Sequence, residues 1–129
     1  MKITVIDDDK ILSNLIKEAI EYRGNHDVTV FNRAADAITN LNELLASDVV
    51  LLDLMMRRPE TLPVGIGEET GEALLRLIKK SNIRLPVIII TGKEVKDISA
   101  NIRNQSIDVL MKPLDPKFND LLEAIHNAK

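Results

Sequence analysis

Four short apolar runs in this chain end on polar side chains that can bind phosphate or a divalent metal ion. In chain order, these polar groups are Asp7-Asp8-Asp9, Asp53, Thr91 and Lys112, the last followed by Pro113. If the runs are parallel strands of one open sheet, all four groups lie at its carboxyl edge, where ligands bind in such folds. We therefore expect residues that are far apart in sequence to form one site.

The chemistry of such a site follows from its charges. Asp7, Asp8 and Asp53 would repel one another, and a hard divalent cation is the simplest way to keep them ionised. Mg²⁺ fits best because it accepts one or two carboxylates, keeps several waters and bridges to phosphate oxygens. Thr91 and Lys112 could then contact a phosphoryl group, and one carboxylate would be the nucleophile that forms an acyl phosphate.

The elements that would hold these residues alternate along the chain. Apolar runs rich in valine and isoleucine predict strands at about 3–6, 28–31, 49–52, 87–90 and 107–111. Apolar residues at helical spacing predict helices at about 11–21, 34–46, 71–80, 94–103 and 116–127. This alternation implies right-handed crossovers and a parallel sheet with helices on both faces. We predict an α/β protein with a flavodoxin-like doubly wound fold and the strand order 2-1-3-4-5.

Some boundaries and one loop can also be predicted. Gly24 is expected to end the first helix, and Asp115 with Pro116 predicts the N-cap and first turn of the last helix. The segment 54–70 has no helical periodicity and exceeds the about 2–6 residues that a strand-to-helix loop usually needs. It is either a tolerated surface insertion or a lid or docking loop beside Asp53.

Length and composition exclude several classes of protein. The chain has 129 residues, a net charge of -3 and no cysteine. The length predicts one domain over residues 1–129, and the lack of cysteine excludes disulfides and thiolate sites and fits the cytoplasm. The apolar runs are far shorter than the ~20 residues of a membrane span, and no Lys/Arg cluster predicts direct binding to nucleic acid.

The set of strand-end residues resembles a known family. Asp7-Asp8 after the first strand, Asp53 after the third, Thr91 after the fourth and Lys112-Pro113 after the fifth are similar to the receiver domain of two-component response regulators, as in chemotaxis regulators. The resemblance spans essentially the whole chain. Each residue alone is a weak indication, and the conjunction is specific.

The resemblance implies a role for each residue of the site. Asp53 would be the phosphoacceptor, and Mg²⁺ would be bound by Asp8, Asp53 and the backbone carbonyl of Met55, with Asp7 acting mainly through water. Thr91 would be the hydroxyl that moves to meet the phosphoryl group. Lys112 would be the cation that contacts it, and its bond to the following proline is expected to be cis.

The resemblance also implies partners. A histidine kinase or histidine phosphotransfer protein would supply the phosphoryl group, which adds a charge of about -1.5 to -2. A downstream protein would read the face formed by the predicted elements at 94–103, 107–111 and 116–127, and a phosphorylation-dependent dimer is compatible with this pattern. The chain would be a stand-alone receiver or part of a longer regulator, with no enzyme activity beyond its own phosphorylation and dephosphorylation.

Two departures from the family keep a second interpretation open. Val109 occupies the strand position three residues before the lysine, where the family usually has an aromatic switch residue, and the loop after Asp53 is unusually long. Both are compatible with a pseudo-receiver that binds partners without phosphorylation. The intact Asp53, Thr91 and Lys112 favour phosphorylation instead.

A third interpretation is a haloacid-dehalogenase-like phosphatase. Asp7 and Asp9 form an Asp-x-Asp pattern after a strand, in which Asp7 would be the nucleophile. The chain lacks a later acidic strand end to complete that metal site, and this interpretation leaves Asp53 unexplained. Asp9 is more simply the N-cap of the first helix.

Overall fold

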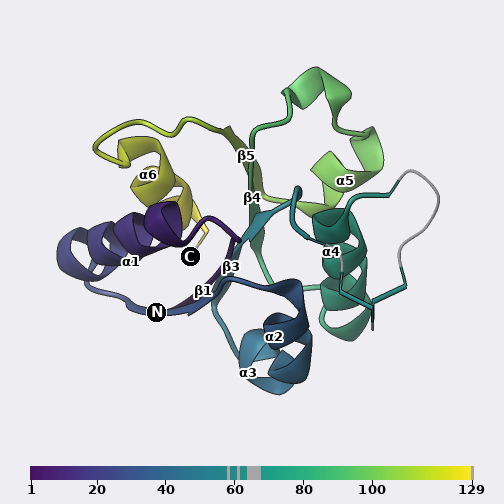
Figure 1. The fold of residues 1–129 in the computed structure, drawn as a ribbon. Coiled ribbons are helices and arrows are strands. Elements are labelled where there is room, and N and C mark those ends of the chain that lie inside the picture. Colours follow the sequence, from purple (N-terminus) through teal and green to yellow (C-terminus); the bar gives the residue numbers. More distant parts are fainter. Residues whose placement is uncertain (58, 61, 64–67, 129) are drawn as a thin grey trace.

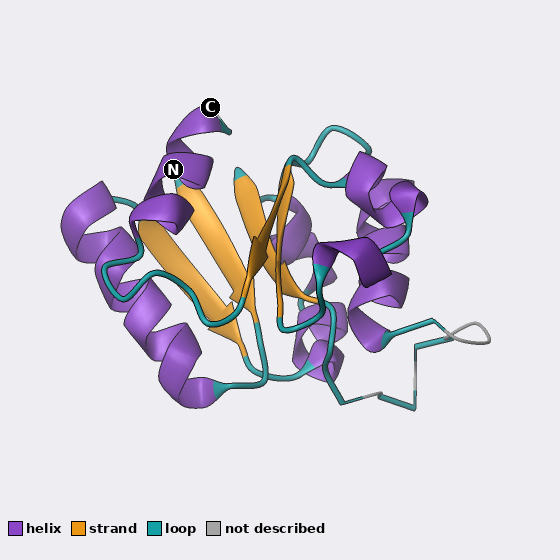
Figure 2. Ribbon diagram, turned by 90° about the horizontal axis from the view of Figure 1, so that it is seen from above, coloured by secondary structure: helices purple, strands orange, loops and turns teal. Residues whose placement is uncertain are grey.

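The computed structural model describes residues 1–57, 59, 60, 62, 63 and 68–128, which form a parallel sheet covered by helices on both faces (Figures 1 and 2). The strands are β1 (Lys2–Ile6), β2 (Asp27–Phe31), β3 (Val49–Asp53), β4 (Val87–Thr91) and β5 (Asp108–Met111). They are all parallel and lie in the order β2-β1-β3-β4-β5. The predicted flavodoxin-like fold and strand order are confirmed.

The helices form one layer on each side of the sheet (Figure 1). Their bounds are α1 (Lys10–Gly24), α2 (Ala34–Thr39), α3 (Leu41–Leu45), α4 (Thr70–Ser81), α5 (Ala100–Gln105) and α6 (Asn119–Asn127), with a 3-10 turn η1 (Val95–Asp97). Side chains of α1 and α6 pack into one apolar cluster, while α2 to α5 pack into a second, larger one on the opposite face. The central strands β3 and β4 are buried along their whole length, which explains their continuous apolar sequence.

The helix predicted at 34–46 is in fact two short helices. The chain leaves helical geometry at Asn40, between α2 and α3, where φ is -108° and ψ is 34°. The Asn40 side-chain amide donates to the carbonyl of Asp36 at 2.8 Å. An asparagine that bonds to the backbone in this way competes with the helical ladder, so the apolar periodicity continues across a break that it does not reveal.

The predicted helix at 94–103 is also shorter than expected. Its first part is the turn η1, and α5 begins only after Ser99, whose hydroxyl accepts a hydrogen bond from the amide of Ile102 at 3.3 Å. Ser99 is therefore an N-cap that starts a new helix rather than an interior residue.

The start of the last helix was wrongly predicted, whereas the end of the first was correct. The Asp115 carboxylate accepts from the amides of Lys117 and Asn119 and so closes a turn before α6, which begins at Asn119 instead of Pro116. Helix α1 ends at Gly24, and the left-handed conformation that follows belongs to Asn25, with φ 57°.

The long segment before α4 is anchored to the domain. Of its described residues, Leu54, Met56 and Leu62 are buried in the larger apolar cluster. Arg76 of α4 bonds to Glu68 at 3.0 and 3.3 Å and to the Pro63 carbonyl at 2.9 Å. Residues 58, 61 and 64–67 of the predicted loop lie outside the described part of the chain. Within that part, no helix is both long and apolar enough to cross a membrane.

Candidate functional site

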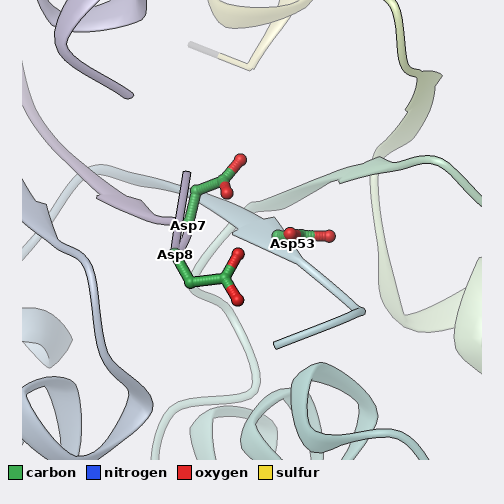
Figure 3. Close-up of side chains that lie close together, drawn as sticks. All are labelled: Asp7, Asp8 and Asp53. Atoms are coloured by element: carbon green, nitrogen blue, oxygen red, sulfur yellow. The ribbon is translucent and has the colours of Figure 1, made fainter. Parts of the chain in front are cut away.

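Three carboxylates meet at the carboxyl edge of the sheet. Asp53 is the last residue of β3, and Asp7 and Asp8 directly follow β1, the strand beside it. Each offers an oxygen within 4.8 Å of the others, and the side chains face a common space (Figure 3). Parallel pairing of β1 with β3 thus brings together residues that are more than forty positions apart, as the sequence predicted.

Lys112 joins two of these carboxylates from the end of β5. Its Nζ lies 2.9 Å from Asp7 Oδ2 and 3.2 Å from Asp53 Oδ2. Asp7 and Asp53 are 1% and 3% exposed, so the ammonium group provides the charge compensation that water cannot. The bond between Lys112 and Pro113 is cis, as predicted.

Backbone amides fix the orientation of both buried carboxylates. The amide of Asp9 donates to Asp7 Oδ1 at 2.9 Å, and the amide of Met55 donates to Asp53 Oδ1 at 3.1 Å. In each case the donor is two residues after the acceptor, which is the geometry of an Asx turn. Asp9 accepts from the amide of Leu12 at 3.0 Å and is the N-cap of α1, the simpler role given to it above.

The electrostatics of the site raise the pKa of Asp53 above its ordinary value. Burial and, after it, the neighbouring charge of Asp7 raise the pKa of Asp53 from 3.8 to about 6, against the opposing effects of the Met55 amide and Lys112. Burial alone would lower the pKa of Lys112, but its contacts with Asp7 and Asp53 outweigh that effect and raise the pKa. At neutral pH Lys112 is therefore charged and Asp53 is mostly ionised.

Thr91 lies at the same edge of the sheet, and its hydroxyl is bonded to the backbone. It ends β4 and is fully buried, and its hydroxyl accepts from the amide of Lys93 at 3.1 Å. Its carbonyl accepts from the amide of Lys112 at 2.7 Å, which ties the ends of β4 and β5 together. Within the described residues, no hydrogen bond joins the Thr91 side chain to Asp53.

The donor set fits a hard divalent cation. Asp7 Oδ2 is buried, and apart from its ion pair with Lys112 it has no hydrogen-bond partner among the described residues. Asp8 is exposed and supplies the third carboxylate of the cluster. Carboxylate oxygens at this separation are ligands suited to Mg²⁺. The Met55 amide places this residue beside Asp53, and its carbonyl as a ligand stays a prediction.

Two supporting residues were missed by the sequence analysis. Asn32 directly follows β2, and its side-chain amide donates to the Asp7 carbonyl and to the Ser13 hydroxyl, both at 2.8 Å. The sequence could have identified Asn32, because it directly follows a predicted strand, as the other site residues do. Gly71 packs so closely on the backbone of Asp53 and Leu54 that a side chain would overlap it, and no local pattern predicts that contact.

Comparison with known proteins identifies the family. The sequence profile described as "Response regulator receiver domain" matches residues 3–126. The chain belongs to the response regulator receiver domain family. Receiver domains of two-component systems are signalling domains rather than conventional enzymes, so the family assignment favours the receiver interpretation over the phosphatase.

Individual relatives agree with this assignment. The chain is 27% identical over 114 residues to the transcriptional regulatory protein TrcR of Mycobacterium tuberculosis, covering 88% of this chain and 40% of that protein. Among solved structures, the receiver domain of the Francisella response regulator 1452 matches with a TM-score of 0.78 and 28% identity over 98% of this chain and 94% of that one. The BeF3-activated DrrB receiver domain matches with a TM-score of 0.74 and 26% identity over 98% and 95% of the two chains.

Proposed function

We propose that this receiver domain accepts a phosphoryl group on Asp53 and signals through a changed surface for protein partners. The observation that carries the proposal is the grouping of Asp53, Asp7 and Asp8 with Lys112 at one sheet edge. The matched family and the beryllofluoride-activated relative support it. The proposal covers residues 1–129 as one domain acting in the cytoplasm.

Different residues of the site would have different roles in phosphoryl transfer. An oxygen of Asp53 forms a bond to phosphorus while the bond between phosphorus and the donor atom breaks. Lys112 is already 3.2 Å from Asp53 Oδ2 and stabilises negative charge on the phosphoryl oxygens. Thr91 would turn from the Lys93 amide to donate its hydroxyl to the phosphoryl group.

Asp7, Asp8 and Asp53, with the Met55 carbonyl, would hold Mg²⁺, which neutralises charge on the carboxylates and on the phosphate. The buried Asp7 Oδ2, which has only an ion-pair partner, supports this assignment. The raised pKa of Asp53 supports it as well, because a site that disfavours a buried carboxylate charge gains from a cation.

The phosphodonor would be a histidine kinase or a histidine phosphotransfer protein. The downstream partner would read the face made by α5, β5 and α6, which correspond to the predicted elements at 94–103, 107–111 and 116–127. Ile107 and Met111 on this face are 50% and 42% exposed and offer apolar contacts. Val109 is partly buried against the larger cluster, so the readout proceeds without an aromatic side chain at that position.

Phosphorylation tests the proposal directly. The protein is incubated with acetyl phosphate and Mg²⁺, and its intact mass is compared with those of Asp53→Asn and Asp7→Asn. We expect one phosphoryl adduct on the wild type, none on Asp53→Asn and none when EDTA removes Mg²⁺. Lack of any adduct, together with no response to beryllofluoride, would instead support the pseudo-receiver.

A further inference from the structure

The edge at which the strands begin forms a second surface, at the opposite end of the sheet from the carboxylate cluster. Backbone hydrogen bonds join its parts, because the amide of Asp48 donates to the Lys2 carbonyl at 2.8 Å and the amide of Val50 to the Pro86 carbonyl at 3.0 Å. The starts of β1, β3 and β4 are thereby held together. We call this surface, which extends from the ends of α1 and α3 to the end of α4, the amino edge. Helices α3 and α4 lie on the same face of the sheet (Figure 1).

The half of the amino edge at the end of α4 is basic. Lys80 and Arg84 are exposed, and neither forms an ion pair with any described residue. Lys79 donates to the carbonyls of Ile83 and Leu85 at 3.3 and 2.5 Å, which fixes the loop after α4. Ile83 is 78% exposed on this loop. The basic half therefore presents a large apolar side chain that two cations flank in the sequence.

The half of the amino edge at the starts of β1 and β2 is acidic and hollow. A pocket of about 380 Å³ is formed there by residues of α1, β1, β2 and α3 and of the loop after α3. Glu21, Asp27 and Glu43 bring exposed carboxylates to it, against the single cation of Lys2. Among the described residues, none of the three carboxylates has an ion-pair partner. Ala46 adds apolar surface to the pocket, so a cationic surface with a projecting apolar side chain would complement it.

The two signs of charge on one edge decide which partner fits. An anionic membrane or a nucleic acid would be attracted by the basic half and repelled by the acidic half. A second copy of the chain, rotated by half a turn about an axis perpendicular to the sheet, sets the basic half of each copy against the acidic half of the other. This rotation keeps corresponding faces of the two sheets on the same side. The end of α4 therefore meets the end of α3 of the other copy, since both helices cover one face.

We propose that the amino edge is a self-complementary surface through which two copies of this chain form a symmetric dimer. Ile83 of each copy enters the acidic pocket of the other, and the cations that flank it lie against Glu21 and Glu43. Each contact occurs twice, so the assembly closes at two copies. The carboxyl edge with Asp53 is not part of the contact. The dimer therefore forms with or without phosphorylation and does not rest on the proposed function.

Sedimentation equilibrium of the wild type tests the assembly. A small interface made of exposed charges and one apolar side chain belongs to the transient class, so we expect a dimer with a dissociation constant of about 10–100 µM. Raising NaCl from about 0.05 M to about 0.5 M should weaken the dimer about tenfold, because salt screens exposed charges. Asp53→Asn should dimerise as the wild type does. A wild type that stays monomeric about tenfold above this concentration range would overturn the proposal.

Charge reversal assigns the contact to the amino edge. Lys80→Glu with Arg84→Glu should raise the dissociation constant more than about tenfold, and so should Glu21→Lys with Glu43→Lys. An equimolar mixture of these two double variants should form a heterodimer, because each half again meets the opposite sign. A chain that carries all four substitutions should form a homodimer for the same reason.

The apolar contact has its own variants. Ile83→Ser should raise the dissociation constant more than about tenfold, and Ile83→Leu should retain the dimer, because a large apolar side chain has to fill the pocket. Lys96→Glu with Lys117→Glu is the matched control for the charge reversals. Both lysines are exposed and lie in segments that follow the carboxyl ends of strands, so this variant changes the net charge equally and should dimerise as the wild type does.

Each other outcome overturns the proposal. A dimer that survives both charge reversals would place the interface elsewhere. A mixture of the two reversed variants that stays monomeric would exclude the pairing of basic with acidic halves, and growth beyond two copies would exclude the closed arrangement. A monomeric wild type that binds vesicles of phosphatidylglycerol through Lys80 and Arg84 would assign the basic half to a membrane instead.

Discussion

At the scale of single residues, the site consists of two buried carboxylates that one ammonium group holds together. Lys112 contacts both Asp7 and Asp53, and both carboxylates are almost fully buried. This compensation is incomplete, because the pKa of Asp53 still rises to about 6. The folded protein thus retains an electrostatic cost that a bound metal cation can relieve.

Replacing Asp53 should stabilise the metal-free protein at neutral pH. The pKa of Asp53 is about 6 when folded against an ordinary 3.8, so between these values the folded state binds more protons than the unfolded state. Stability contributed by this group is therefore full below about pH 4 and is lost as the pH rises through about 6. Asp53→Asn should be more stable than the wild type by about 1–2 kcal/mol at pH 7, and by much less at pH 4.

Urea denaturation in EDTA at both pH values measures this difference. Asp27→Asn, which removes an exposed carboxylate at the start of β2, is the control and should show no comparable change with pH. A wild type that is more stable than Asp53→Asn at pH 7 would refute the assigned pKa shift.

Replacing Lys112 should destabilise the metal-free protein at neutral pH. Lys112→Met leaves two buried carboxylates without their cation, which should cost about 3 kcal/mol of unfolding free energy at pH 7 in EDTA. Mg²⁺ should recover part of the loss. Lys96→Met, which breaks an exposed ion pair with Glu94, should change stability very little, and equal losses in the two variants would contradict this role for Lys112.

At the scale of helices and strands, the sequence predicts the elements that follow from the apolar pattern. It does not reveal the helix breaks and turns that single side-chain hydrogen bonds produce. All five strands were predicted correctly because each is a short apolar run, and their alternation with helices predicted the parallel order. The breaks at Asn40 and Ser99 were missed because side-chain bonds to the backbone interrupt the helices without altering their periodicity. The two carboxylate turns were likewise invisible until the backbone was known.

The junction between β3 and α4 shows how one contact positions the site. The Gly71 amide donates to the Leu54 carbonyl at 2.8 Å, and a Cβ on Gly71 would overlap the backbone of Asp53 and Leu54. Gly71→Ala should therefore cost about 3 kcal/mol of unfolding free energy and displace Asp53. At Gly92 an added Cβ meets no atom within 4 Å, so Gly92→Ala is the matched control. Equal stability of the two variants by denaturant titration would refute the close approach.

The long segment after β3 should be held down by Arg76. Arg76→Met removes its bonds to Glu68 and to the Pro63 carbonyl but should change the unfolding free energy by less than about 1 kcal/mol, since the ion pair is partly exposed. Chymotrypsin cleavage between residues 54 and 69 should become faster. Arg84→Met is the control, and identical cleavage in both variants would mean that Arg76 does not anchor the segment.

At the scale of the whole molecule, the parallel sheet brings the residues of the site together. Apolar clusters on both faces fix the strands, and the parallel order places the ends of β1, β3, β4 and β5 along one edge. Asp7 and Asp8 follow β1, while β3, β4 and β5 each bring one functional group to that edge, so distant sequence positions become neighbours. In the proposed function, a charge on Asp53 would reach a partner through α5, β5 and α6.

The chemical identity of the phosphorylated residue tests this account most directly. The protein is treated with acetyl phosphate and Mg²⁺, the acyl phosphate is reduced with borohydride, and the modified residue is located by mass spectrometry of its peptides. The account predicts modification at Asp53 alone. Modification at Asp7, with Asp53 unchanged, would contradict it and would support the phosphatase-like nucleophile instead.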